Sequence, residues 1–239
     1  MQKHIKVALF DLDGTLLPMD QDEFIAAYFS TLVGKLAPFG YDKKLIDVVW
    51  RGTFDMIKNN GEVTNDTLFW KAFIAEYGER AQSDERLFDD YYNNDFQKVS
   101  AACGFNPKAA EVVSFCKASG LRVALATNPI FPAVATNARI KWAGLHPSDF
   151  ELVTTYEHSH SCKPNLAYYE EICDKLNVLP SECVMIGNDV SEDMVARDLG
   201  MSVFLLTDCL INKTNADISE YPHGSFDALT DFIKELAAA

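Results

Sequence analysis

Residues 5–15 read IKVALFDLDGT, and this stretch decides the fold. Its first part, Ile5–Phe10, is almost entirely apolar and does not alternate with polar residues. Such a run predicts a short strand buried on both faces, as in a parallel sheet covered by helices. Asp11 and Asp13 follow at once, and Gly14 favours a turn. Because ligands of open α/β sheets bind at the carboxyl ends of the strands, we expect both acids at a binding edge.

Further apolar runs resemble the first, and helical patterns lie between the later ones. The expected strands are Ile5–Phe10, Leu121–Thr127, Leu152–Thr155, Cys183–Ile186 and Ser202–Leu206. The expected helices are Pro107–Ser119, Pro132–Ala143, Pro164–Leu176, Ser191–Leu199 and a last one near Phe226–Leu236, and proline or glycine marks several of their ends. Strands that alternate with helices predict an α/β fold with a doubly wound parallel sheet.

The interval from about residue 20 to residue 103 breaks this alternation, because it contains helical patterns and no convincing strand. The candidate helices are Asp22–Ala37, Lys43–Lys58, Asn65–Tyr77 and Asp84–Val99. Four amphipathic helices can bury a common seam. We therefore expect a second, smaller, all-helical lobe inserted after the first strand.

Composition limits the partners of the chain. Its 239 residues carry a formal net charge of −14, which would repel nucleic acid and anionic membranes. Six scattered cysteines without a CxxC pair fit a reducing cytoplasm, and neither an export signal nor a membrane-spanning run is expected. The sequence predicts a cytoplasmic protein with a small-molecule partner. An anionic partner would need a metal ion or lysines to reverse the local charge.

The pair Asp11 and Asp13 suggests a hard metal ion such as Mg²⁺, because adjacent carboxylates repel one another unless a cation or a shared proton intervenes. A solvated Asp-Gly turn is the alternative for the pair alone. Three further polar groups follow later strands: Thr127-Asn128, Lys163-Pro164, and Gly187-Asn188-Asp189 with Asp193. Each of them alone also occurs as an ordinary turn, helix start or loop. Together, and in this order, they can converge on one crevice.

With these motifs in this order, the chain resembles the haloacid dehalogenase (HAD) superfamily, whose four motifs surround one site. Many members carry a helical cap inserted just after the first motif. The resemblance covers essentially the whole chain. It implies a HAD-like Rossmannoid core at residues 1–18 and 100–239, a helical cap at residues 19–99, and a phosphatase that uses Mg²⁺.

The resemblance also implies catalytic roles. Asp11 becomes the nucleophile that accepts the phosphoryl group, and Asp13 becomes the acid/base that protonates the leaving oxygen and later activates water. Thr127 and the backbone amide of Asn128 hold phosphoryl oxygens. Lys163 neutralises charge on Asp11 and on the transferred group, as phosphoryl transfer requires.

The metal ligands implied by the resemblance are the Asp11 carboxylate, the Asp13 carbonyl and Asp189, with Asp193 one shell further out. The sequence departs from the family pattern at two points. Asn165 stands where many relatives have an acid after the proline, and Asn188 precedes Asp189 in the fourth motif. The second departure leaves open whether Asp189 or Asn188 takes the metal position. The four-residue spacing from Asp189 to Asp193 occurs in the family and favours Asp189.

Hydrolysis of a small phosphate monoester through an aspartyl phosphate is the favoured function, because Asp13 supplies the acid that an ester leaving group needs. Dehalogenases of the superfamily generally lack this second acid. A phosphomutase keeps the same residues and stays an alternative, as does a non-catalytic module that binds a phosphorylated ligand. The substrate cannot be read from the sequence. Polar or aromatic candidates for selecting it are Lys43, Lys44, Trp50, Arg51 and Arg80.

A separate pattern precedes the lysine motif. His158, His160 and Cys162 alternate, so an extended chain would place all three on one side, where they could bind a soft metal. A polar loop is the commoner structure for such a stretch.

Overall fold

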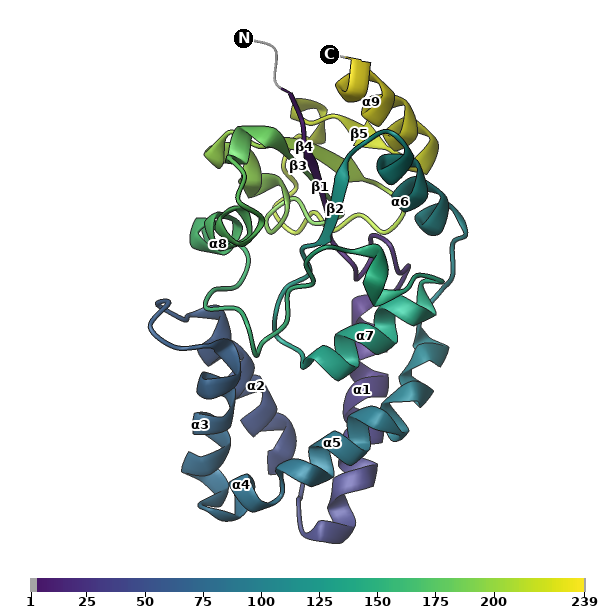
Figure 1. The fold of residues 1–239 in the computed structure, drawn as a ribbon. Coiled ribbons are helices and arrows are strands. Elements are labelled where there is room, and N and C mark those ends of the chain that lie inside the picture. The colour runs from purple at the N-terminus through teal and green to yellow at the C-terminus, as the bar shows by residue number, and fades with distance from the viewer. Residues whose placement is uncertain (1–3, 239) are drawn as a thin grey trace.

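A five-stranded sheet forms the centre of one lobe in the computed structural model, which describes residues 4–238 (Figure 1). The strands run in the order β2-β1-β3-β4-β5, and all of them are parallel. Their bounds are β1 (Val7–Phe10), β2 (Arg122–Leu125), β3 (Cys183–Gly187), β4 (Ser202–Leu206) and β5 (His223–Gly224). The predicted fold class is confirmed, and β1 occupies an interior position of the sheet between β2 and β3.

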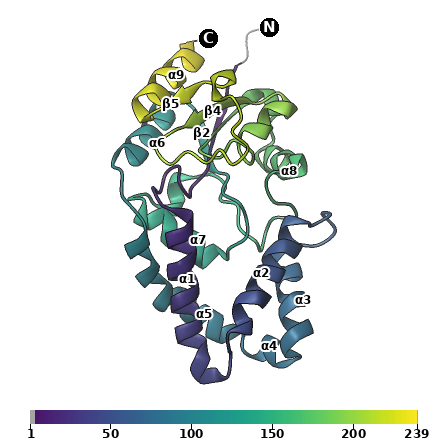
Figure 2. The same cartoon turned by 180° about the vertical axis from the view of Figure 1, so that it is seen from behind.

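Both faces of the sheet are covered by helices, which explains why β1 is apolar throughout. Ala8 and Phe10 pack into one apolar cluster with α6 (Lys108–Ala118) and α9 (Phe226–Ala238). Val7 and Leu9 point the other way, into a cluster with α8 (Leu166–Leu176). Figures 1 and 2 show α8 on the opposite side of the sheet from α6 and α9.

Three local predictions about the α/β lobe need correction. Leu152–Thr155 is not a strand, because only Val153 forms a bridge, with Leu125 of β2. The Thr154 hydroxyl donates to the Thr127 carbonyl at 2.6 Å, so a side chain takes the place of continued ladder pairing. The helix expected over Ser191–Leu199 is a shorter 3₁₀ helix, Met194–Leu199, and the two-residue strand β5 was not predicted.

The helices that follow β1 in the chain lie on the side of the sheet where the strands end (Figure 1). They are α1 (Gln21–Leu36), α2 (Lys44–Ile57), α3 (Asn65–Tyr77), α4 (Arg80–Ser83) and α5 (Glu85–Asn93), followed by a 3₁₀ segment, Asp95–Ala102. α1 begins where the Asp20 carboxylate accepts from two backbone amides, an ordinary N-cap. The single helix predicted over Asp84–Val99 is therefore divided between α5 and the 3₁₀ segment.

One aromatic-rich core joins these helices to the α/β lobe. Phe24, Leu32 and Phe73 belong to it, and α7 (Ala133–Trp142) contributes Ala135 and Ala138 from the other lobe. The helical lobe thus packs directly on α7. That residues 19–99 form a separate cap domain stays a prediction. Within residues 4–238, no helix is long and apolar enough to cross a membrane.

Two adjacent positions on α3 test this core. Phe73 is fully buried in the aromatic cluster, whereas the side chain of Ile74 is exposed. Phe73→Ala should lower the free energy of unfolding by about 3–5 kcal/mol, because it leaves a cavity among rings that cannot collapse onto it. Ile74→Ala should change it by less than about 1 kcal/mol. Urea unfolding followed by circular dichroism measures both, and equal effects would contradict this packing.

Candidate active site

Asp11 and Asp13 lie where β1 leaves the sheet. The Asp11 amide donates to the Ile186 carbonyl of β3 at 2.9 Å, so the residue is fixed at the strand end. Gly14 then turns the chain with φ +81°, and a Cβ placed there would lie 2.4 Å from the Asn188 side-chain nitrogen. Only glycine meets both conditions. The Asp-Gly pair thus brings the first motif against the fourth.

Lys163 forms the centre of the site. Its ammonium group donates to Asp11 Oδ1 at 2.8 Å and to Asp193 Oδ1 at 2.6 Å, and the residue is only 1% exposed. Burial alone would lower the pKa of Lys163, but the charges of Asp11 and Asp193 raise it well above its usual value. Lys163 therefore stays cationic between the two carboxylates.

Burial has a clear effect on the pKa of Asp11. Burial raises its pKa to about 7, against the opposing charge of Lys163, and the charges of Asp193 and Asp13 add to the increase. Two or more carboxylates therefore compete for one ammonium group. A further cation would relieve this excess of negative charge.

Asp193 is held under the end of β3 by a close backbone approach. Its second oxygen accepts from the Asp189 amide at 2.9 Å. A Cβ on Gly187 would lie 2.1 Å from that oxygen, so a side chain at this position would displace the carboxylate. Asp193 thus contacts Lys163 directly, and its place one shell out from the metal stays a prediction.

Asn188 and Asp189 have different environments. The Thr15 hydroxyl donates to Asn188 Oδ1 at 2.9 Å and lies 3.3 Å from Asp11 Oδ2. This hydroxyl therefore bridges the Asn188 side chain and the carboxylate of the predicted nucleophile. Asp189 Oδ1 accepts from the amides of Ser191 and Glu192. Both residues line the same cavity. The metal position of Asp189 stays a prediction.

The donor chemistry suits a hard cation. The Asp11 carboxylate, the Asp13 carbonyl and the oxygens of Asn188 and Asp189 are all hard oxygen donors. Among residues 4–238, no three His, Cys, Asp or Glu side chains are grouped so as to hold a metal ion by themselves. The ligands that the resemblance implies would combine carboxylates with a carbonyl oxygen.

The second motif lies at the same edge of the sheet. Thr127 and Asn128 line the cavity, and the Thr127 carbonyl is anchored by the hydroxyls of Thr154 and Tyr168. The Asn128 side chain donates to Glu192 at 3.0 Å, an interaction that the sequence did not suggest. Burial raises the pKa of Glu192. All the residues predicted for the site from the four motifs thus come from one edge.

Arg139 of α7 is a site residue that the sequence analysis missed. It is 1% exposed, it forms an ion pair with Asp13 Oδ2, and its guanidinium group lies 4.5 Å from the centre of the Phe131 ring. The signal was available, because Arg139 lies four residues after Ala135 on the inward face of a predicted helix. A cation on such a face needs a partner.

A cavity of about 340 Å³ extends from these residues into the helical lobe. Acids line its floor, namely Asp11, Asp13, Asp189, Glu192 and Asp193. Of the candidates for substrate selection, Trp50 lines the cavity, whereas Arg51 pairs with Glu76 and Arg80 pairs with Asp84 elsewhere on the lobe. Lys43 and Lys44 are exposed and are not lining residues.

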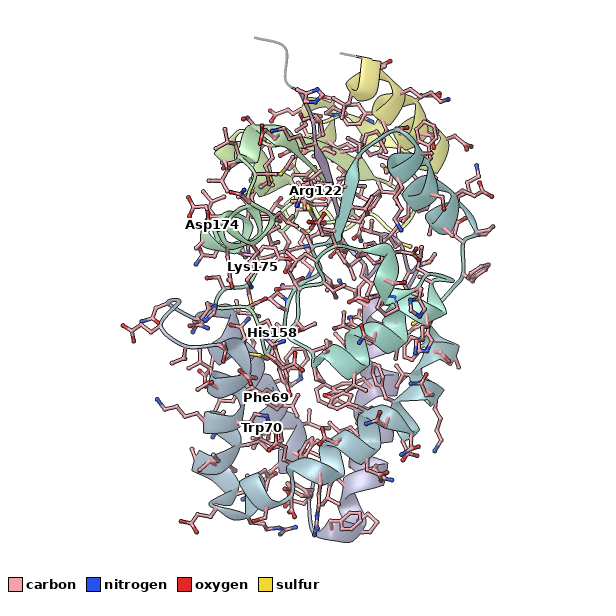
Figure 3. All side chains as sticks on the ribbon, in the orientation of Figure 1. Phe69, Trp70, Arg122, His158, Asp174 and Lys175 are labelled. Atoms are coloured by element: carbon pink, nitrogen blue, oxygen red, sulfur yellow. The ribbon has the colours of Figure 1, made fainter. Side chains whose placement is uncertain are left out.

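The histidine pattern before Lys163 does not assemble a metal site. His160 pairs with Glu171 at 2.9 Å, and Lys175 donates to the His158 carbonyl, a contact whose two residues are labelled in Figure 3. Cys162 is buried and accepts from Asn65. The alternative of a polar loop therefore describes this stretch.

Comparison with known proteins identifies the family. The model of the haloacid dehalogenase-like hydrolases matches residues 5–200. A phosphoglycolate phosphatase of Vibrio vulnificus (strain YJ016) is 28% identical over 207 residues, which cover 86% of this chain and 85% of that protein. The predicted superfamily and enzyme class, a phosphatase, are thereby confirmed.

Solved structures agree at the level of the fold. A HAD phosphatase from Thermococcus onnurineus superposes with a TM-score of 0.60 at 18% identity, over 96% of this chain and 98% of that one. A 2-haloacid dehalogenase from Pseudomonas syringae pv. Tomato DC3000 gives 0.62 at 18% identity, over 97% and 99%. The family match spans the motifs from Asp11 to Asp193, and the chain therefore belongs to the haloacid dehalogenase-like hydrolases.

Proposed function

We propose that this hydrolase cleaves a small phosphate monoester with Mg²⁺ as cofactor and Asp11 as nucleophile. The observation that carries the proposal is the buried cation of Lys163 between Asp11 and Asp193. Phosphoryl transfer depends mainly on positioning and on cancelling negative charge. A lysine held at the strand edge beside a carboxylate supplies both. The free cysteines along the described chain are compatible with the cytoplasmic location expected from the sequence.

In the first half of the proposed reaction, a carboxylate oxygen of Asp11 attacks phosphorus and the bond from phosphorus to the ester oxygen breaks. Asp13 donates a proton to that oxygen, so the alcohol leaves neutral. Asp13 Oδ1 is buried and has no hydrogen-bond partner within residues 4–238, which leaves it free for this contact. Arg139 holds the other oxygen and thereby fixes the direction of the carboxyl group.

In the second half, water attacks phosphorus of the aspartyl phosphate while Asp13 accepts its proton. The bond from phosphorus to the Asp11 oxygen breaks, and inorganic phosphate leaves. Lys163 balances the charge on Asp11 as the carboxylate returns. Thr127 and the Asn128 amide are proposed to hold the phosphoryl oxygens at the opposite side of the crevice.

Mg²⁺ would be held by the Asp11 carboxylate, the Asp13 carbonyl and Asp189, with Asn188 as the competing ligand. The hard oxygen donors of these residues support the assignment. When bound, the ion would neutralise charge on the phosphoryl group and help to orient it.

A phosphomutase is less well supported than a phosphatase. Such an enzyme must also bind the second phosphate of a doubly phosphorylated intermediate. The part of the cavity formed by the helical lobe has no lysine or arginine among its described lining residues. Hydrolysis therefore fits the cavity better than transfer within a sugar phosphate.

The raised pKa of Asp11 predicts that metal binding depends on pH. A proton bound to Asp11 must leave before the carboxylate can ligate Mg²⁺. The apparent association constant should rise by about tenfold per pH unit below about pH 7 and level off above it. Isothermal titration in buffers of different ionisation enthalpy measures affinity and proton release together. An affinity independent of pH would contradict the assignment of Asp11 as a ligand.

The same titration separates the two candidate ligands. Asp189→Ala should weaken Mg²⁺ binding by at least about tenfold if Asp189 is a ligand, and Asn188→Ala should do so if Asn188 is. Phosphatase activity should vanish in EDTA, and Ca²⁺ should replace Mg²⁺ poorly because its coordination shell is larger and looser. Undiminished turnover in EDTA would remove the metal from the mechanism.

Asp11 and Asp13 should differ in a covalent assay. Asp11→Asn should abolish turnover and any phosphoenzyme, because an amide is a poor nucleophile. Asp13→Asn should lose roughly 10²–10⁴-fold in rate and still accept phosphate slowly from an aryl phosphate, whose leaving group needs little protonation. Intact-mass spectrometry after an acid quench should detect the adduct on Asp13→Asn only. The control Asp198→Asn, at an exposed carboxylate, should behave like the wild type. An adduct on Asp11→Asn would refute the assignment.

Lys163→Ala should lower the rate of phosphate release by at least about 10²-fold, because it removes the buried cation that faces the nucleophile. Its stability should also fall, since two buried carboxylates lose their partner. Lys175→Ala removes a lysine from the surface of α8 and should leave the rate unchanged. Steady-state kinetics on folded protein, checked by circular dichroism, makes the comparison. A near-normal rate for Lys163→Ala would mean that another cation fills this role.

A further inference from the structure

The cavity has two chemically different halves. Its floor carries the carboxylates of the strand edge, whereas the helices α1, α2, α3 and α5 form the opposite wall. The lining residues of these helices are Gln21, Phe24, Ile25, Tyr28, Phe29, Val49, Trp50, Thr53, Ile57, Phe69 and Tyr92. None of them is charged. A phosphoryl group on the floor would therefore direct its ester group into an uncharged, largely aromatic pocket.

The helical wall of the pocket offers an anionic leaving group no counter-charge. The one lysine or arginine among the described lining residues is Lys213, which is exposed and lies in the loop after β4. Lys163 is already bonded to two carboxylates, and Arg139 is paired with Asp13. Burying an unpaired carboxylate beside apolar groups is strongly unfavourable. The pocket therefore opposes a substrate such as phosphoglycolate, which the Vibrio relative is named for.

Three polar side chains of the pocket already have hydrogen-bond partners. The hydroxyls of Tyr28 and Tyr92 form a hydrogen bond of 2.9 Å, and the Thr53 hydroxyl donates to the Val49 carbonyl at 2.9 Å. Few polar groups are thus left that require a hydroxyl-rich ligand such as a sugar. Neutral apolar surface is the better complement.

The pocket walls are suited to a ring. The ring centres of Phe29 and Trp50 lie 5.6 Å apart. The rings of Tyr28 and Phe131 meet edge to face, with 5.3 Å between their centres. Figure 3 shows Phe69, which also lines the cavity, within the helical lobe on the α3 side. The whole cavity of about 340 Å³ is at the lower end of the size of small-molecule sites, about 300–1,000 Å³.

We infer that the substrate is a phosphate monoester of an uncharged alcohol that carries an aromatic ring or a similarly bulky apolar group, bound between α1, α2 and Phe131. This inference rests on the proposed phosphatase function. It assigns the phosphoryl group to the strand edge and the alcohol to the aromatic pocket, with Phe29 and Trp50 as residues that determine specificity.

Three alkyl phosphates separate charge from apolar contact: 2-phenylethyl phosphate, ethyl phosphate and phosphoglycolate. All three release a primary alcohol, so the ring and the carboxylate are the main differences between them. With Mg²⁺ present, kcat/KM should fall in that order, by about 100-fold from the first to the last. If kcat/KM for phosphoglycolate equalled or exceeded that for 2-phenylethyl phosphate, the inference would be overturned and the phosphatase proposal would stay intact.

Two phenylalanines of the helical lobe give a matched comparison. Phe29 lines the cavity, whereas Phe39 is 46% exposed and does not. Phe29→Ala should reduce the preference for 2-phenylethyl phosphate over ethyl phosphate by roughly tenfold, and Phe39→Ala should preserve it. An unchanged preference in Phe29→Ala would place the ring elsewhere and overturn the assignment of the pocket.

Binding of the alcohols separates failure of this inference from failure of the proposed function. Equilibrium binding of 2-phenylethanol and of glycolate is measured in EDTA, so that no metal ion contributes to the binding of glycolate. The wild type should bind 2-phenylethanol and not glycolate, and Phe29→Ala should weaken the binding. If none of the three esters were hydrolysed, the phosphatase proposal would fail, and this binding result would still decide the nature of the pocket. Preferential binding of glycolate would overturn it.

Discussion

The buried ammonium group of Lys163, held between Asp11 and Asp193, is the interaction on which the rest of the site depends. A lysine and two carboxylates cannot be removed from water unless their charges and hydrogen bonds are satisfied. The surrounding backbone meets this condition, because Gly187 leaves room for the Asp193 carboxylate and the Asp189 amide donates to it. One ammonium group still faces more than one acid. The site therefore retains an excess of negative charge, which a hard cation and a phosphoryl group bound together can use.

The two lobes divide the work between reaction and selection. The strand edge supplies the charged residues, whereas the helices after β1 supply an uncharged wall on the other side of the cavity. α7 connects the two, since its apolar side chains pack into the core of the helical lobe and Arg139 pairs with Asp13. A displacement of the helical lobe would therefore change the position of the Asp13 carboxyl group, which is proposed as the acid and base.

Much of the fold could be predicted from the sequence, because short apolar runs and capped helices have local signals. The four motifs were also local, and parallel strands bring their ends to one edge. Local signals failed where tertiary contacts decided the outcome. Thr154 bonds a carbonyl and ends the pairing beside β2, and β5 has only two residues. The residues that select the substrate were the hardest to predict, because in a sequence the apolar residues that line a cavity cannot be told from those of the core. Trp50 was the one proposed selector that the cavity includes.

The stereochemical course at phosphorus tests the central claim, that Asp11 accepts the phosphoryl group, most directly. A phosphate monoester made chiral with three oxygen isotopes is hydrolysed by the wild-type enzyme in the presence of an acceptor alcohol, and the configuration of the transferred phosphoryl group is determined. Transfer through Asp11 requires two in-line displacements, each of which inverts phosphorus, and the account predicts net retention. Net inversion would mean that the acceptor attacks the substrate directly, and it would contradict the covalent role of Asp11.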